Sequence, residues 1–494
     1  MKKDKIFQFE FSMSLPRRIA YNVVFTSGAK IFGTVLALVS IGFITRYLGK
    51  DGFGDYSTVL AFFAFFSAIA DLGLYAISTR EISRLESDEK SILGNVFAIR
   101  MSASFAMLAI SPVLVWLFPY SPGVKAGIIV SALAYVFASG YSVLIGLFQK
   151  RLAMDKVAIG EFTGKVIQLA TIVLVVKNNL GFLAIVSSLF FNMLVSFAII
   201  FLLSKKYLSF RFRFEWDKWK SFLKESYPVG VSAVITFAYF KLDTILLSVL
   251  KTNTDVGIYN AAYKVVENVA FFPAMFVGLV MPIMSRFIFS ERRKFEQVAN
   301  KTFKVFLVLS VPLVVGAFFL AENIIGLIGG EGFSESVLVF RILAFAMTFI
   351  FFGSFFTNVI IAGSQQKKLM PILLFCAVFN ISLNLILIPK FSYNGAAVVS
   401  SLTEFLVAAL SGTVCWRLLK YSPSFDKFFA IAFSGLAMGV IFFFSSNLFF
   451  PARALLGVVG YFIFLWIFRA VSAEEISSLI SRKGPEMREY EPMA

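Results

Sequence analysis

The runs KNNLGFLAIVSSL (residues 177–189) and KFSYNGAAVVSSL (residues 390–402) align without gaps at an offset of 213 and share six of thirteen residues. A second match has an offset of 203, because Gly54-Asp55-Tyr56 and Gly257-Ile258-Tyr259 each open an apolar segment. Both offsets equal six such segments. Two six-helix halves with the same topology explain the pattern, and paired repeats are typical of alternating-access transporters.

The composition of the 494-residue chain is that of an integral membrane protein. Hydrophobic residues make up 59% of it and charged residues 15%, and the mean hydropathy is +0.83. A membrane-spanning helix needs about 20 mostly apolar residues. On that criterion the sequence predicts an all-α polytopic protein with 14 transmembrane helices, at residues 19–45, 56–78, 93–118, 124–147, 156–176, 180–203, 226–249, 256–284, 305–320, 336–361, 369–388, 394–416, 428–445 and 451–468.

Lys and Arg residues are distributed unevenly between the two sides of the predicted bundle. The loops on the side of both termini carry 33 of the 46 basic residues, the opposite loops carry 8, and five lie within spans. Because basic residues accumulate in cytoplasmic loops, we expect both termini in the cytoplasm. The charged N-terminus precedes a long apolar segment without a typical cleavage site, so we expect no removable signal peptide.

The predicted domain organisation follows the repeat. It comprises an N-terminal six-helix lobe (1–203), a basic cytoplasmic linker (204–225), a C-terminal six-helix lobe (226–416), two additional helices (417–470) and a cytoplasmic tail (471–494). The basic linker and residues 286–304 are either determinants of topology or surfaces that attract anionic lipids or an anionic substrate.

Several function classes are excluded or disfavoured. The chain has no histidine, which excludes imidazole bases and His-ligated metals. Its two cysteines, Cys376 and Cys415, lie in apolar runs and are expected to be buried packing residues. The net charge of +17 is explained by topology, so we expect no nucleic-acid partner. No large outer loop is available for a membrane glycosyltransferase or polymerase.

Ten ionisable residues lie inside predicted spans, where each needs a partner, an aqueous cavity or a function. The bases are Lys30, Arg100, Lys165, Lys241 and Lys264, and the acids are Asp71, Glu161, Asp243, Glu267 and Glu404. Three groups form polar stripes at helical spacing, namely Thr26, Ser27, Lys30 and Thr34; Glu161, Lys165, Gln168 and Thr171; and Asn260, Lys264, Glu267 and Asn268. Such stripes indicate a polar interior rather than a lipid-facing surface.

All five embedded bases lie in the first eight helices, which predicts a cationic cavity that binds an anionic substrate. A diphosphate is the strongest candidate, because Lys and Arg donors match its oxygens. Lys241 is turned about 200° from Asp243 on its helix. The alternative to a place in the cavity is therefore that its side chain snorkels outward. The alternative for Glu161 with Lys165 and for Lys264 with Glu267 is a structural pair on one helix.

The carboxylates have two interpretations. Asp71, Asp243, Glu267, Glu404 and Glu161 are candidates for coupling to a proton or sodium gradient. The alternative is that they pair structurally with the embedded bases. Lys30 and Arg100 have no acid within four residues on their own helices, which favours a functional role for these two bases.

Several stretches resemble the polysaccharide biosynthesis transporters, which include O-antigen-type lipid-linked oligosaccharide flippases of the multidrug/oligosaccharidyl-lipid/polysaccharide exporter superfamily. The matching stretches are ITRYLGKDGFGDYS (44–57), DLGLYAISTREISR (71–84), 256–287, 340–368 and 379–404. The resemblance implies two six-helix lobes around a cationic cavity, in which Lys30, Arg100, Lys165 and Lys264 would be the basic residues.

The resulting prediction is a non-enzymatic flippase in the plasma membrane that translocates a polyprenyl-diphosphate-linked oligosaccharide by alternating access. We expect no cofactor, with a cation gradient as the energy source, and membrane lipids and other polysaccharide assembly proteins as partners. The alternatives are a cation-coupled multidrug exporter of the same superfamily and, in another class, a membrane glycosyltransferase or polymerase.

Overall fold

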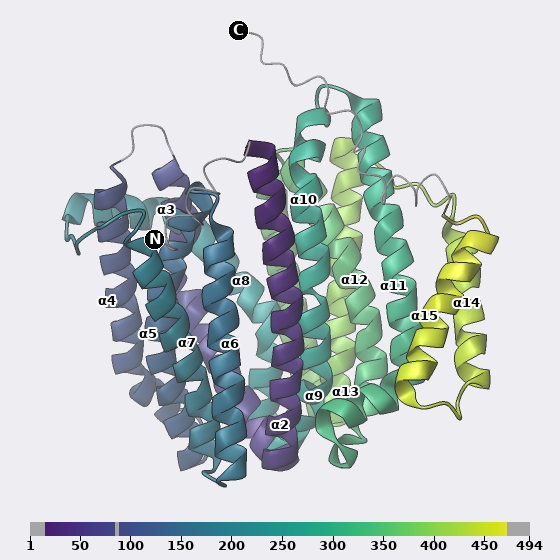
Figure 1. Cartoon of the computed structure of the whole chain (residues 1–494), viewed down its shortest axis with the longest axis horizontal. Helices are drawn as coiled ribbons and strands as arrows, with labels where there is room; N and C mark the ends of the chain where they lie inside the picture. Colours follow the sequence, from purple (N-terminus) through teal and green to yellow (C-terminus); the bar gives the residue numbers. More distant parts are fainter. Residues whose placement is uncertain (1–14, 84–87, 472–494) are drawn as a thin grey trace, which may run out of the picture. The chain divides into compact units, whose positions relative to one another are not determined.

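The computed structural model describes residues 15–83 and 88–471, and every regular element in these ranges is helical. The charged N-terminus and residues 472–494 of the predicted tail lie outside them. The helices (Figure 1) are α2 (Leu15–Asp71), α3 (Leu74–Ser83), α4 (Glu89–Trp116), α5 (Pro122–Lys150), α6 (Met154–Lys177), α7 (Phe182–Ser204), α8 (Trp216–Leu250), α9 (Asn253–Val269), α10 (Phe271–Phe287), α11 (Arg292–Gly329), η1 (Glu331–Phe333), α12 (Ser336–Ala362), η2 (Gln366–Lys368), α13 (Leu369–Leu419), α14 (Phe428–Phe444) and α15 (Phe450–Ile467).

Local sequence explains where several helices begin. The Asp88 carboxylate accepts a hydrogen bond from the backbone N–H of Ser91 (3.1 Å) and caps α4. Ser121 caps α5 in the same way and is followed by Pro122, whose fixed φ suits the first helical position. α7 follows Gly181, which has a φ of +83° that a glycine adopts without strain.

The two longest helices are bent near their middles. α2 turns at Gly49 (φ +67°) and α13 at Ser392 (φ +48°), so each holds parts of two predicted spans. Asn179, between α6 and α7, has a φ of +51°. Asn179 and Ser392 occupy the same third position in the two matching sequence runs, so both runs reverse direction at equivalent residues.

The prediction of an all-helical polytopic membrane protein is confirmed. Among the described residues, nine helices are long and apolar enough to span a membrane, or up to 11 if two strongly bent helix pairs each count as one span. α14 is apolar but has only 17 residues. The number of 14 crossings and the orientation remain predictions.

The described chain divides into two compact units. Unit 1 consists of the described residues within 1–265, 326–336 and 373–400. Unit 2 consists of the described residues within 266–325, 337–372 and 401–494. In unit 1, α4 to α7 lie side by side and α2 packs against α5 and α6 (Figure 1). The predicted lobe boundaries follow the sequence repeat rather than these contacts, and they stay a prediction.

Unit 2 has a core rich in aromatic residues. Phe303, Phe306 and Phe355 are buried in it together with Cys415. The Cys415 thiol contacts the backbone oxygen of Phe356 at 3.5 Å. Both cysteines are buried, as predicted, and both are thiols rather than halves of a disulfide.

Candidate functional site

Arg100 on α4 forms a buried ion pair with Asp71 at the end of α2. Only 3% of the Arg100 side chain is exposed, against 25% of that of Asp71. The Arg100 Nε donates to the Ser139 hydroxyl (3.4 Å), and the Gly73 N–H donates to the second Asp71 oxygen (3.2 Å). The charge of Arg100 is therefore balanced by a partner on another helix.

Lys165 on α6 packs against α2 at Gly33. A Cβ atom at position 33 would lie 3.0 Å from the Lys165 ammonium nitrogen, so the glycine provides the space for this close approach. Glu161 lies one turn before Lys165 on α6, and Lys30 lies three residues before Gly33 on α2. The structure thus brings together Lys30, Lys165 and Glu161, three residues that the sequence placed on two polar stripes.

Two tyrosines lie beside these groups. The Tyr141 hydroxyl donates to a carboxylate oxygen of Glu161 (3.4 Å), and the Tyr75 hydroxyl on α3 donates to the side-chain oxygen of Gln149 (3.2 Å). We call Lys30, Asp71, Arg100, Glu161 and Lys165 the N-terminal polar cluster. Its three bases outnumber its two acids, so the cluster as a group of five residues is net positive.

The remaining predicted site residues lie elsewhere. The Lys241 ammonium group on α8 lies 5.3 Å from the centre of the Tyr263 ring, a cation–π arrangement. Lys264 and Glu267 are half-buried on α9, and Glu404 on α13 is buried.

Asp243 on α8 is buried among neutral hydrogen-bond donors. One of its oxygens accepts from the amide nitrogen of Asn384 (2.7 Å), and the other accepts from the hydroxyls of Tyr259 (3.1 Å) and Ser400. The Asn384 amide nitrogen also donates to the side-chain oxygen of Asn380 (3.0 Å). In the described part of the chain, the side-chain oxygen of Asn384 is buried without a hydrogen-bond partner.

Sequence reasoning identified Asp243 but missed Asn380 and Asn384. The signal was available, because the two asparagines lie four residues apart in an otherwise apolar run and therefore share one helix face. Carboxylate and amide oxygens together are ligands for hard cations. No group of three or more Cys, Asp or Glu residues suited to a metal ion occurs within residues 15–83 and 88–471.

Two glycines of the short repeated motif pack against each other reciprocally. A Cβ at Gly54 would lie 1.9 Å from the backbone oxygen of Asn253, and one at Gly257 would lie 2.1 Å from that of Lys50. Lys50 and Asn253 are themselves related by the offset of 203. The second half of α2 and the start of α9 therefore cross in backbone contact, which a larger residue at either glycine prevents.

Polar contacts reinforce this end of unit 1. The Thr254 hydroxyl donates to Asp51, and Lys50 forms an ion pair with Glu335 (2.7 Å). The Ser392 hydroxyl at the bend of α13 donates to Asp255 (2.6 Å). We call this contact region the glycine crossing. It consists of the two glycines and the residues that contact each other around them, namely Lys50, Asp51, Gly54, Asn253, Thr254, Asp255, Gly257, Glu335 and Ser392.

Comparisons with known proteins add family information. A family model described as "Polysaccharide biosynthesis protein" matches residues 19–288, and one described as MatE matches residues 228–386. The capsular polysaccharide biosynthesis protein CapF of Staphylococcus aureus is 24% identical over 62% of this chain and 79% of its own length. The probable low-salt glycan biosynthesis flippase Agl15 of Haloferax volcanii is 24% identical over 76% of this chain and 79% of its length.

Solved structures share the fold. The lipid II flippase MurJ in an inward closed conformation has a TM-score of 0.74 at 16% identity, covering 90% of this chain and 98% of that one. An inward-facing multidrug resistance MATE transporter has a TM-score of 0.64 at 13% identity, covering 81% of this chain and 100% of that one.

Proposed function

Because the chain belongs to the polysaccharide biosynthesis protein family, we propose that it is a flippase for a polyprenyl-diphosphate-linked oligosaccharide. The family resemblance expected from the sequence is confirmed, and the relatives are named for capsule and glycan biosynthesis. The observation that carries the proposal is the N-terminal polar cluster, whose three bases lie on three helices of the matched region. A multi-pass transporter of the plasma membrane, without catalysis, accounts for these features.

We propose a topology of 14 crossings for this flippase. α2 and α13 have 57 and 51 residues, more than twice the ~20 residues of one crossing, and each bends near its middle. If each of them crosses twice, then these four crossings, the seven other candidate spans, the two bent pairs and α14 would add up to fourteen in the described residues. An even number is consistent with two cytoplasmic termini and with six-helix lobes at 1–203 and 226–416.

Alternating access follows from the repeat. In the proposed topology the glycine crossing lies at the outer end, where it closes the molecule toward the outside. The N-terminal polar cluster then receives the diphosphate and the first sugars from the cytoplasmic side, while the prenyl chain stays in the lipid. Opening of the glycine crossing releases the sugars outward.

The test of the function is flipping in liposomes. The purified chain is reconstituted with a polyprenyl-diphosphate oligosaccharide, and crossing is measured by protection from an external glycosidase. Lys30→Gln/Lys165→Gln is expected to lower the rate about tenfold or more, because charged hydrogen bonds contribute about 1.5–3 kcal/mol each. Lys90→Gln/Lys301→Gln, at two exposed lysines, should retain the wild-type rate. Absence of flipping by the wild type refutes the function, whereas normal flipping by Lys30→Gln/Lys165→Gln refutes only the site.

We further propose Asp243 as the residue that couples transport to a sodium or proton gradient. Its neutral partners and the buried Asn384 oxygen leave a single negative charge that a cation can compensate. Asp243→Asn should keep the size of the side chain but abolish stimulation of flipping by imposed sodium or pH gradients, measured separately. Glu322→Gln, at an exposed carboxylate, should retain the stimulation. If Asp243→Asn remains stimulated, the coupling residue is another carboxylate, and Glu267 and Glu404 are the next to test.

The second candidate function is multidrug export, favoured by the MatE match to residues 228–386. The positive surplus of the N-terminal polar cluster opposes the binding of cationic drugs. Gradient-driven efflux of ethidium by the reconstituted protein, without flipping of any lipid-linked glycan, would establish this alternative.

A further inference from the structure

The segment between α7 and α8 follows a fixed path across the start of α4. The Arg213 N–H donates to the Gly94 oxygen (3.4 Å), and the Glu215 N–H donates to the side-chain oxygen of Asn95 (2.9 Å). A Cβ at Gly94 would lie 2.4 Å from the Arg211 oxygen. The close backbone approach therefore depends on a glycine, and the segment is held against α4 at the alternate residues 211, 213 and 215.

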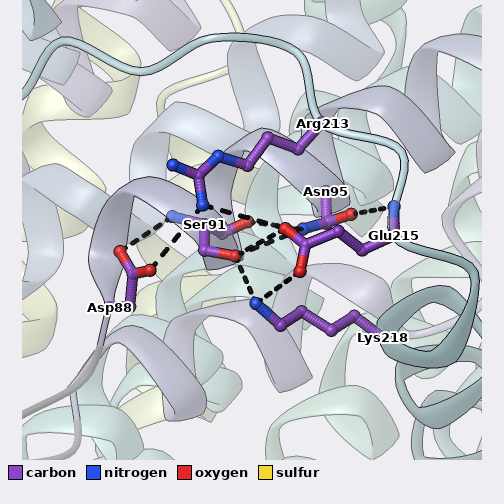
Figure 2. A network of polar contacts seen from close by, with 6 residues as sticks. All are labelled: Asp88, Ser91, Asn95, Arg213, Glu215 and Lys218. Carbon is purple, nitrogen blue, oxygen red and sulfur yellow. Dashed lines mark hydrogen bonds and ion pairs between the residues drawn. The ribbon is translucent and has the colours of Figure 1, made fainter.

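Side chains complete this attachment (Figure 2). The Glu215 carboxylate accepts hydrogen bonds from Ser91 and Asn95 (both 3.0 Å) and forms an ion pair with Lys218 (2.7 Å). These contacts lower the pKa of Glu215 to about 2, and the contact with Lys218 has the largest effect. The carboxylate stays ionised at neutral pH. Its negative charge is compensated by the ion pair with Lys218.

Aromatic side chains of the same segment are divided between two environments. Phe210 packs against Phe97 with ring centres 5.5 Å apart, and Phe97 belongs to a buried core. The Phe212 ring also lies 5.2 Å from Phe97 between ring centres, but the side chains of Phe212, Phe214 and Trp216 remain 68%, 69% and 63% exposed. Phe214 contacts the half-buried Trp219 at 4.4 Å between ring centres. The exposed row formed by Phe212, Phe214 and Trp216 is therefore packed against the protein at Phe214.

Basic side chains accompany the exposed row. Lys205, Lys206, Arg211 and Lys220 are all exposed. The position of the segment relative to the membrane follows from its neighbours. It connects the end of α7, a candidate membrane span that ends at Ser204, to the start of α8 at Trp216. Its residues therefore lie at the membrane surface, where aromatic rings and lysines or arginines accumulate.

We propose that residues 205–220, here called the linker platform, bind the head groups of anionic phospholipids. Phe212, Phe214 and Trp216 insert at the level of the head groups. Arg211 and Lys220 contact the phosphates, because basic residues close to an anionic leaflet are attracted to it. The loops on the side of both termini, to which the platform belongs, carry 33 basic residues against 8 in the opposite loops. By this bias the platform faces the cytoplasmic leaflet. The attachment to α4 through Glu215 gives the platform its shape, and the proposal does not depend on the transported substrate.

The experiment uses the full chain in phosphatidylcholine nanodiscs with Trp216 as the only tryptophan, the other four being replaced by Phe. Fluorescence quenching is compared between dibrominated phosphatidylglycerol and dibrominated phosphatidylcholine at equal mole fraction. We expect stronger quenching by the brominated phosphatidylglycerol, because the platform enriches it locally. Equal quenching by the two lipids would overturn the anionic preference. Absence of quenching by either would show that the platform faces water or a protein partner, which overturns the proposal entirely.

Charge variants identify the source of the preference. Arg211→Gln/Lys220→Gln should equalise quenching by the two lipids while Trp216 remains quenched. Lys177→Gln/Lys390→Gln removes the same charge from two exposed lysines at other helix ends and should leave the preference unchanged. If the preference persists in Arg211→Gln/Lys220→Gln, the lipid is attracted by other residues and the platform is not its binding site.

Discussion

Gly54→Ala is expected to arrest transport without unfolding the protein. The added Cβ would lie 1.9 Å from the Asn253 backbone oxygen, a contact that no side-chain rotation relieves. The conformation with a closed glycine crossing is therefore destabilised, while a conformation in which α2 and α9 separate is not. An overpacking penalty of about 1–3 kcal/mol shifts a two-state equilibrium by roughly 5- to 150-fold.

Thiol accessibility measures this shift directly. Ser57 is 2% exposed and lies one turn beyond Gly54, so Ser57→Cys places a protected thiol beneath the glycine crossing. The native cysteines are buried and contribute little background. In the Gly54→Ala background the thiol at position 57 should react with a maleimide from outside, and flipping should fall in parallel.

Gly28→Ala is the matched control on the same helix. A Cβ at Gly28 meets no atom within 4 Å, so this variant should flip substrate normally and keep the thiol protected. If Gly54→Ala flips at the wild-type rate with an unreactive thiol, then the glycine crossing does not open during transport. Gly257→Ala should reproduce the Gly54→Ala result, because the crossing is reciprocal.

The fold was largely predictable because its determinants are local. Long apolar runs identify membrane helices without knowledge of their neighbours, and the repeat predicted which segments are equivalent. The bend at Ser392 and the turn at Asn179 lie at matching positions of the two repeated runs. The division of α2 from α3 at Leu72 and Gly73, which have φ of +46° and +76°, was not anticipated within the span predicted at 56–78.

The partners of the site residues were not predictable in the same way. Arg100 was favoured as a substrate ligand because its own helix has no nearby acid. Its partner Asp71 is 29 residues away on another helix, and only the packing of α2 against α4 brings them together. Likewise, the space for Lys165 depends on Gly33, which no spacing rule singles out. Periodicity identifies a polar face, but the pairing of faces is a property of tertiary packing.

Arg100→Ala is expected to destabilise the protein strongly, by about 3 kcal/mol. Breaking a buried ion pair typically costs 3–5 kcal/mol, and the lower end applies because a quarter of the Asp71 side chain is exposed. The midpoint of thermal unfolding in detergent should fall by several degrees. Transport should decline only as far as the folded fraction does, if Arg100 positions helices rather than touching the substrate.

A double variant separates the ion pair from a role in binding. Asp71→Leu/Arg100→Met replaces both charges by apolar groups, which is often neutral or stabilising for a buried pair, so the unfolding midpoint should recover. Arg80→Ala is the matched control, because Arg80 pairs with Glu81 and Glu225 at 50% exposure. Such exposed pairs contribute about 0–1 kcal/mol, so its midpoint should stay near that of the wild type. If Asp71→Leu/Arg100→Met is stable yet fails to flip substrate, then Arg100 or Asp71 acts in transport itself, and the pair belongs to the substrate site rather than to its framework.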